Sequence, residues 1–153
     1  MRLAVRRHLA LPARGRLLVS ADVHGDGESF ACVEELWRAL RAEEPETHWV
    51  QLGDVVHGPS DEARRRAPEL YAYEDASAQI VARIIALQRE APGHVHFVLG
   101  NHDYAHIGGP ITRKFFDDEP AALEARMAPA EVAAMRALFE RALLAGSTPC
   151  GAL

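Results

Sequence analysis

Three short groups of polar residues in this chain carry side chains that could bind divalent transition metals. The groups are Asp22-Val23-His24, Gly53-Asp54-Val55-Val56-His57 and Gly100-Asn101-His102-Asp103. Carboxylate oxygens, imidazole nitrogens and amide oxygens are ligands for ions such as manganese, iron and zinc. The first two groups are weak signals alone, because Asp after a strand is often only a turn former. A metal site therefore requires a fold that brings the three groups together.

Each group lies where a predicted strand ends. Apolar runs and helical spacing predict strands at 16–21, 48–52 and 94–99 and helices at 29–43, 70–90 and 129–146. The β-α-β-α-β order predicts an α/β fold with a mainly parallel sheet and helices on its faces. Ligands of open α/β sheets bind at the carboxyl ends of the strands. The sequence therefore predicts that the three groups meet at one edge of the sheet.

Composition indicates one globular domain over residues 1–153. Apolar residues make up 48% and charged residues 25% of the chain, and the formal charge of −5 argues against nucleic acid as a partner. No apolar run is long enough to span a membrane. Cys32, predicted as a small buried group on a helix, and Cys150, predicted in a turn, do not form a disulfide framework. A reduced, cytoplasmic setting is expected. The one lysine, Lys114, among 16 arginines indicates only coding bias.

The ordered motifs D-x-H, G-D-x-x-H and G-N-H-D resemble those of the calcineurin-like metallophosphoesterase superfamily. The resemblance implies the first half of a four-layered α/β-β/α sandwich. It also implies two divalent metal ions, manganese first with iron or zinc as alternatives, that activate a water against a phosphoester. One ion is expected to bind Asp22, His24 and Asp54. The other is expected to share Asp54 and to bind Asn101.

The same resemblance assigns catalytic roles next to the metal ligands. His102 is expected to stay off the metals and to protonate the leaving oxygen as general acid. Asp103 is expected to hold the His102 imidazole in the required tautomer. His57 and His106 are expected to contact the substrate phosphate, the alternative for each being a solvated loop histidine.

The details of the motifs favour a bacterial serine/threonine protein phosphatase-like member. Gly58 and Leu99 stand where phosphoprotein phosphatases of the superfamily carry phosphate-gripping arginines, whereas 23–25 and 106–110 are similar to the bacterial proteins. The expected reaction is hydrolysis of a phosphomonoester on a protein or a small molecule. The alternatives are a nucleotide phosphodiesterase of the same superfamily, and a catalytically incomplete fragment or pseudoenzyme that acts through binding only.

The histidines that the resemblance implies for later segments have no counterpart in this sequence, because no histidine follows His106. We therefore expect the domain to be truncated at its C-terminus and the 153-residue chain to be catalytically incomplete by itself. It should bind at most one metal ion and have negligible phosphatase activity. The apolar run that begins at Ala152 and Leu153 would leave an open sheet edge and favour self-association.

Overall fold

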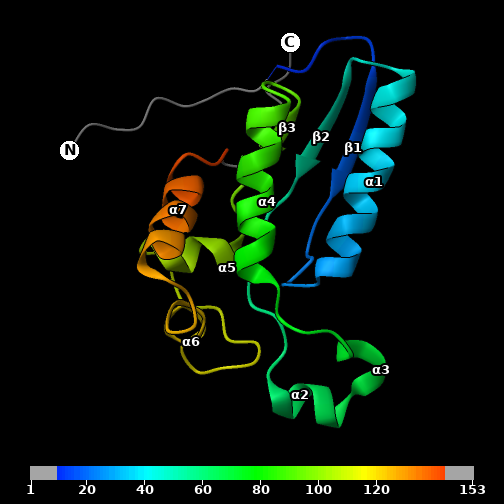
Figure 1. Cartoon of the computed structure of the whole chain (residues 1–153). Helices are drawn as coiled ribbons and strands as arrows, with labels where there is room; N and C mark the ends of the chain where they lie inside the picture. Colours follow the sequence, from blue (N-terminus) through cyan, green and yellow to red (C-terminus); the bar gives the residue numbers. More distant parts are fainter. Residues whose placement is uncertain (1–9, 144–153) are drawn as a thin grey trace, which may run out of the picture.

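The computed structural model describes residues 10–143 of the chain (Figure 1). Its strands β1 (Arg16–Ser20), β2 (Thr47–Gln51) and β3 (Val95–Phe97) form a parallel sheet in the order β1-β2-β3. All three point the same way, so their carboxyl ends meet at one edge. The predicted α/β class with a parallel β-α-β-α-β order is confirmed, although β3 is shorter than the predicted 94–99.

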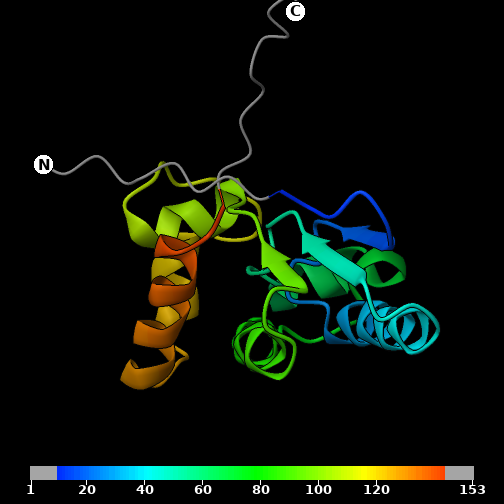
Figure 2. The same cartoon turned by 90° about the horizontal axis from the view of Figure 1, so that it is seen from above.

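Two long helices cover one face of this sheet (Figure 2). They are α1 (Gly27–Glu43) and α4 (Ser77–Glu90), which connect successive strands. Right-handed crossovers between neighbouring parallel strands in this order place both helices on the same side. The core between helices and sheet includes Phe30, Trp37, Trp49, Ile80, Ile84, Leu87, Val95 and Phe97. On the opposite face of β1, Leu17 and Val19 remain 53% and 48% exposed, because side chains alternate along a strand.

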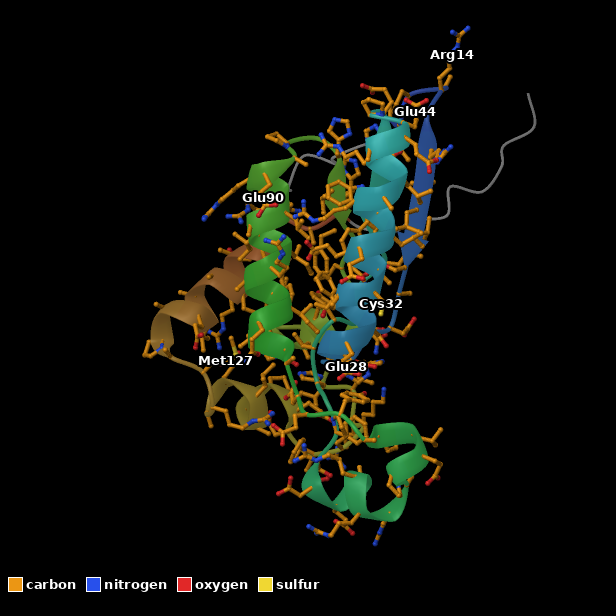
Figure 3. All side chains as sticks on the ribbon, turned by 45° about the vertical axis from the view of Figure 1, so that its right-hand side comes forward. Arg14, Glu28, Cys32, Glu44, Glu90 and Met127 are labelled. Carbon is orange, nitrogen blue, oxygen red and sulfur yellow. The ribbon has the colours of Figure 1, made fainter. Side chains whose placement is uncertain are left out.

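The prediction that Cys32 is buried is wrong. Its side chain is exposed on α1 (Figure 3). The stripe of α1 that faces the core contains Phe30 and Trp37, with Val33 packed beside them. Residue 32 is two positions from Phe30, or about 200° around the helix, and therefore points away from the core. The predicted turn at Cys150 lies outside the described residues.

The helix predicted over 70–90 is interrupted. Its first residues belong to α3 (Pro68–Tyr71), which follows the short α2 (Asp61–Arg66), and α4 begins only at Ser77. Between α3 and α4 the chain pairs with the loop after β1. Asp75 forms an antiparallel bridge with Asp26, and the Ala76 N–H donates to the Gly25 carbonyl at 2.8 Å. These tertiary bonds hold 72–76 out of the helical conformation.

The chain after β3 forms short elements around the carboxyl edge of the sheet. They are α5 (Asn101–Tyr104), a 3-10 turn (Ala105–Ile107), α6 (Glu119–Glu124) and α7 (Pro129–Glu140). Helix α7 begins at the predicted proline and packs against α4 and the 3-10 turn. Beyond it, Leu143 pairs in parallel with Val98 beside β3. The predictions for 144–146 and for Ala152-Leu153 lie outside the described residues. No helix within 10–143 is long and apolar enough to cross a membrane.

Candidate metal centre

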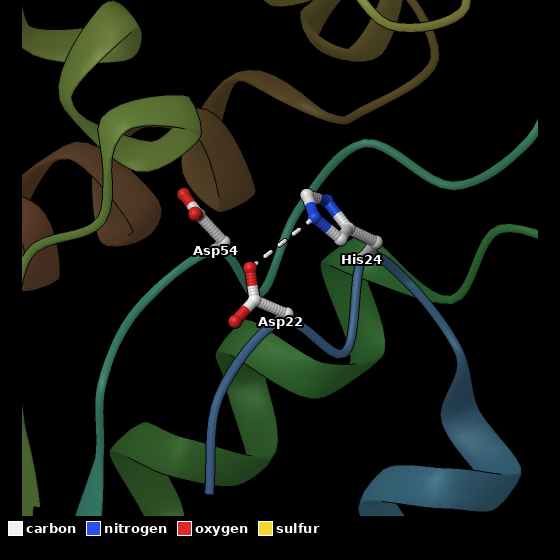
Figure 4. A group of neighbouring side chains, drawn as sticks. All are labelled: Asp22, His24 and Asp54. Carbon is white, nitrogen blue, oxygen red and sulfur yellow. Dashed lines mark ion pairs between the residues drawn. The ribbon is translucent and has the colours of Figure 1, made fainter.

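The loops that follow β1 and β2 run side by side and bring two of the predicted groups together. The His24 N–H donates to the Asp54 carbonyl at 3.0 Å, and the Gly25 N–H donates to the Val55 carbonyl at 3.0 Å. As a result, the side chains of Asp22, His24 and Asp54 converge (Figure 4). One ligand atom from each lies within 4.8 Å of the others, and among residues 10–143 no other group of three His, Cys, Asp or Glu side chains does so.

The backbone at these residues is strained. Asp22, His24, Asp54 and His57 have φ values of 56°, 42°, 53° and 71°, and they are the only non-glycine residues with positive φ in the described part of the chain. Such conformations are costly for residues with a Cβ and are concentrated at functional sites. Asp22 and His24 therefore do not continue the extended conformation of β1. Their side chains nevertheless approach each other, with His24 Nε2 3.8 Å from Asp22 Oδ1.

His24 is held in a form that suits a metal ligand. Its Nδ1 lies 3.3 Å from the carbonyl oxygen of Val56, so the Nδ1–H can donate there and leave the lone pair on Nε2. Burial, and next the charge of Lys114, lower the pKa of His24, which keeps the imidazole neutral at pH 7. A neutral imidazole is the form that binds a metal ion. The exposed Asp22 carboxylate lies beside this lone pair.

The G-N-H-D group is joined to Asp54 by hydrogen bonds. The backbone N–H of His102 donates to Asp54 Oδ1 at 2.8 Å. Asn101 precedes it at the start of α5, and its Nδ2 donates to the Thr112 hydroxyl at 3.0 Å. That bond uses the amide nitrogen, and the amide oxygen of Asn101 has no hydrogen-bond partner among residues 10–143. The arrangement fits a second ion that would share Asp54 and take the Asn101 oxygen.

Asp103 does not have the role expected of it. Its carboxylate accepts backbone N–H groups from Asp54 at 2.8 Å, Gly100 at 3.0 Å and Val55 at 3.2 Å, and it makes no hydrogen bond to His102. Burial raises the pKa of Asp103 to about 7, against the effect of these three donors. Asp103 therefore fastens the loop after β2 to the loop after β3.

His57 and His106 are not placed to contact substrate. His57 is 2% exposed and the side chain of His106 is fully buried. His57 Nδ1 lies 3.0 Å from His102 Nδ1, and His57 Nε2 lies 2.9 Å from His106 Nε2. The substrate-binding interpretation and its alternative of solvated loop histidines are both wrong, because the two rings pair with each other inside the protein.

The sequence interpretation missed Lys114. Burial lowers the pKa of its ammonium, while Asp22 and Asp54 act in the opposite direction. Burial is the main cause of the lowered pKa of His24 and His102, and the positive charge of Lys114 is a further cause. Lys114 therefore lies within electrostatic reach of the candidate centre. The buried Glu119 carboxylate supports this loop by accepting backbone N–H groups, among them that of Lys114 at 2.8 Å. The one lysine among 16 arginines was the available signal.

A cavity of about 610 Å³ lies between α2, the segment before α4 and the chain around α6. Its lining comes from 59–64, 74–75 and 115–126, with Arg64 and Arg126 as its basic groups. None of the metal-type residues lines it. The candidate centre is therefore defined by the chemistry of converging side chains and not by an enclosed cavity.

Gly100→Ala should weaken metal binding. A Cβ at this position would lie 2.3 Å from both the backbone nitrogen and Oδ1 of Asp54, so the Asp54 carboxylate would have to move. We expect Mn²⁺ affinity to fall roughly 10- to 100-fold, the usual effect of disturbing groups that orient metal ligands. Isothermal titration calorimetry measures this. Gly27→Ala in α1, whose Cβ would meet only Ala76 at 3.1 Å, is the control, and equal losses in both variants would contradict the prediction.

His57 should make the metal-free protein sensitive to acid. Burial, and next His106 and His102, lower the pKa of His57 from 6.5 to about 2. Below pH 6.5 His57 is therefore protonated in the unfolded chain but stays neutral in the folded protein. Stability that is present at pH 7 is lost as the pH falls. Between pH 7 and pH 5, protonation of His57 in the unfolded chain should lower the free energy of unfolding by about 2 kcal/mol. In urea unfolding, His57→Gln should lose correspondingly less stability over this interval, and a loss equal to that of wild type would refute a neutral buried His57.

Comparison with known proteins identifies a family for most of the chain. The family model for calcineurin-like phosphoesterases matches residues 15–140, which include all three polar groups. Comparison with curated proteins and with solved structures gave no match.

Proposed function

The chain belongs to the calcineurin-like phosphoesterase family, and from this membership we propose that it hydrolyses a phosphomonoester, in the manner of a bacterial serine/threonine protein phosphatase. The observation that carries the proposal is the convergence of Asp22, His24 and Asp54 within 4.8 Å at the carboxyl edge of the sheet. A carboxylate pair and an imidazole suit manganese, iron or zinc better than calcium. Manganese is the ion we propose first.

The residues present fit one ion and part of the site of a second. Asp22, His24 and Asp54 would hold one, and Asp54 and Asn101 would contribute to the other. When bound, the two ions would supply Lewis acidity and a water of lowered pKa. Asp54 is suited to the shared position because its carboxylate has lone pairs on both oxygens, of which Oδ1 also accepts the His102 N–H.

His102 is the proposed general acid. Its ring meets that of His24 edge to face, with 4.8 Å between centroids, so it lies beside the ligands without belonging to their group. Its Nδ1 faces His57, which leaves Nε2 to give a proton to the leaving oxygen. Burial lowers the pKa of His102 and Asp54 raises it. The negative charge of a bound phosphate would act in the same direction as Asp54 and hold the proton at Nε2.

Lys114 is the proposed phosphate contact in place of the arginines absent at Gly58 and Leu99. Lys114→Met should raise KM for p-nitrophenyl phosphate about 10-fold or more, the effect of losing one charge-assisted hydrogen bond. Steady-state kinetics measures this, with Arg113→Met as the control, since the Arg113 side chain is 74% exposed and pairs with Asp117. An unchanged KM for Lys114→Met would contradict the assignment.

Hydrolysis assays with two substrates test the proposed function. A chain with the full set of metal ligands should hydrolyse p-nitrophenyl phosphate in the presence of Mn²⁺, lose this activity in EDTA, and act far more slowly on bis(p-nitrophenyl) phosphate. For the 153-residue chain by itself, the expected activity is negligible. Preference for the diester would favour the nucleotide phosphodiesterase alternative. Mn²⁺ binding without hydrolysis of either ester would favour a protein that acts through binding only. The assay compares the 153-residue chain with the same chain extended by any sequence encoded in frame after Leu153.

A further inference from the structure

A row of buried side chains leads away from His102. His102 Nδ1 faces His57 Nδ1 at 3.0 Å, His57 Nε2 faces His106 Nε2 at 2.9 Å, and His106 Nδ1 faces Glu124 Oε1 at 2.8 Å. The outer oxygen of Glu124 pairs with Arg136 at 2.7 Å. The row thus crosses from the loop after β2 to α6 and α7. The three rings are buried, and Glu124 is the point at which the row reaches the partly exposed surface.

Each contact in this row needs one donor and one acceptor. An ionised carboxylate only accepts, and a neutral imidazole has one N–H and one lone pair. Burial lowers the pKa of both His57 and His106, so these rings are neutral at pH 7. Burial raises the pKa of Glu124, but its hydrogen bonds to His106 and Arg136 outweigh this and leave the pKa below its usual value. Glu124 is therefore the fixed acceptor at the outer end.

The tautomers then follow one from another. Since Glu124 accepts, His106 must carry its proton on Nδ1, and its Nε2 is an acceptor. Since His106 Nε2 accepts, His57 must carry its proton on Nε2, and its Nδ1 is an acceptor. His102 must therefore donate from Nδ1, which leaves Nε2 as the nitrogen that exchanges a proton with substrate. The Glu124 carboxylate, at the outer end of the row, therefore determines the tautomer of all three imidazole rings.

We propose that Glu124, through His106 and His57, is the positioning carboxylate that fixes the orientation and tautomer of His102. The inference rests on the proposed function, which assigns His102 the role of general acid. The neighbouring carboxylate, Asp103, is already occupied by three backbone N–H groups and cannot serve. Catalytic histidines are commonly oriented by a carboxylate on the second ring nitrogen. Here two imidazoles separate that carboxylate from the ring it orients.

Nitrogen NMR of the metal-free protein tests the arrangement without any activity. Long-range ¹H–¹⁵N spectra at pH 7 report the tautomer of each ring, and single histidine substitutions assign the signals. We expect the Nδ1–H form for His102 and His106 and the Nε2–H form for His57. In Glu124→Leu, which removes the acceptor, the fixed Nδ1–H form of His106 and His102 should be lost. An Nε2–H form of His102 in the wild type, or unchanged tautomers in Glu124→Leu, would overturn the proposal.

Kinetics gives a second, independent test. Glu124→Leu should lower kcat roughly 10- to 100-fold with little change in KM, as expected when an orienting partner is lost. Glu140→Gln, an exposed change on α7, is the control. His57→Asp would place a carboxylate directly beside His102, so adding Glu124→Leu to His57→Asp should cost no further activity. A further loss as large as that of the single variant would show a merely structural role for Glu124.

The two proposals can fail separately. If neither the 153-residue chain nor its in-frame extension hydrolyses a phosphoester, the proposed function fails, and the NMR spectra alone decide whether Glu124 sets the tautomer of His102. If the protein hydrolyses phosphoesters but His102 is in the Nε2–H form, the proposed function stands and the role of Glu124 is refuted.

Discussion

Replacing Asp54 with Asn is expected to remove most of the metal binding of the protein and all measurable phosphoester hydrolysis. Asp54 is the one side chain proposed to touch both ions, and its neutral amide would offer a single weak oxygen ligand. The fold should survive, because an Asn oxygen can still accept the His102 N–H that Asp54 Oδ1 accepts at 2.8 Å. We expect metal affinity to fall by more than about 100-fold, because substituting a residue that only orients a ligand already lowers affinity by up to about 100-fold. Calorimetric titration with Mn²⁺ measures this.

Two further variants make the Asp54 prediction specific. Asn101→Ala should weaken only the ion that shares Asp54 with Asn101, and so leave the stronger binding event intact. Asp61→Asn removes a carboxylate of the same charge from α2, where the side chain is exposed and pairs with Arg64. Metal loss in Asp61→Asn equal to that in Asp54→Asn would mean that Mn²⁺ responds to net charge and not to the assigned ligands.

His102→Asn is expected to retain metal ions and to lose about 10²- to 10⁴-fold in kcat, the usual contribution of a general acid. The His102 backbone N–H that donates to Asp54 is unaffected by this substitution, so the ligands should stay in place. The loss should shrink for aryl phosphates with acidic leaving groups, because such groups depart without protonation. A series of substituted phenyl phosphates measures this dependence.

The same series can refute the role of His102. Reduced Mn²⁺ binding by His102→Asn would make His102 a ligand. An equal loss of rate for good and poor leaving groups would mean that His102 does not protonate the leaving oxygen. His96→Asn in β3 is the control substitution, since its imidazole lies on the sheet and pairs with His48 at 3.1 Å.

The location of the centre was predictable from the sequence because it depends on topology. Alternating strands and helices predict parallel strands, and parallel strands put the segments after β1, β2 and β3 at one edge. Those segments carry Asp22, Asp54 and Asn101 in this chain. The family match over 15–140 agrees with the motifs that pointed to the superfamily.

The details that the sequence could not give depend on contacts between distant residues. His57 and His106 look like loop histidines in one dimension, and only their 2.9 Å contact, 49 positions apart in sequence, makes them buried partners. Asp103 looks like an orienting carboxylate, yet three backbone N–H groups occupy it. The late start of α4 has the same origin, since pairing of Asp75 with Asp26 overrides local helix propensity. Catalytic incompleteness of the 153-residue chain stays a prediction.

Anomalous diffraction from a crystal grown with Mn²⁺ tests the central claim most directly, because it locates the ion itself. The account predicts a strong peak at the manganese absorption edge within bonding distance of Asp22, His24 Nε2 and Asp54. A crystal with no peak there would contradict the claim. So would an ion bound instead by His48 and His96 on the sheet, whose ring nitrogens lie 3.1 Å apart.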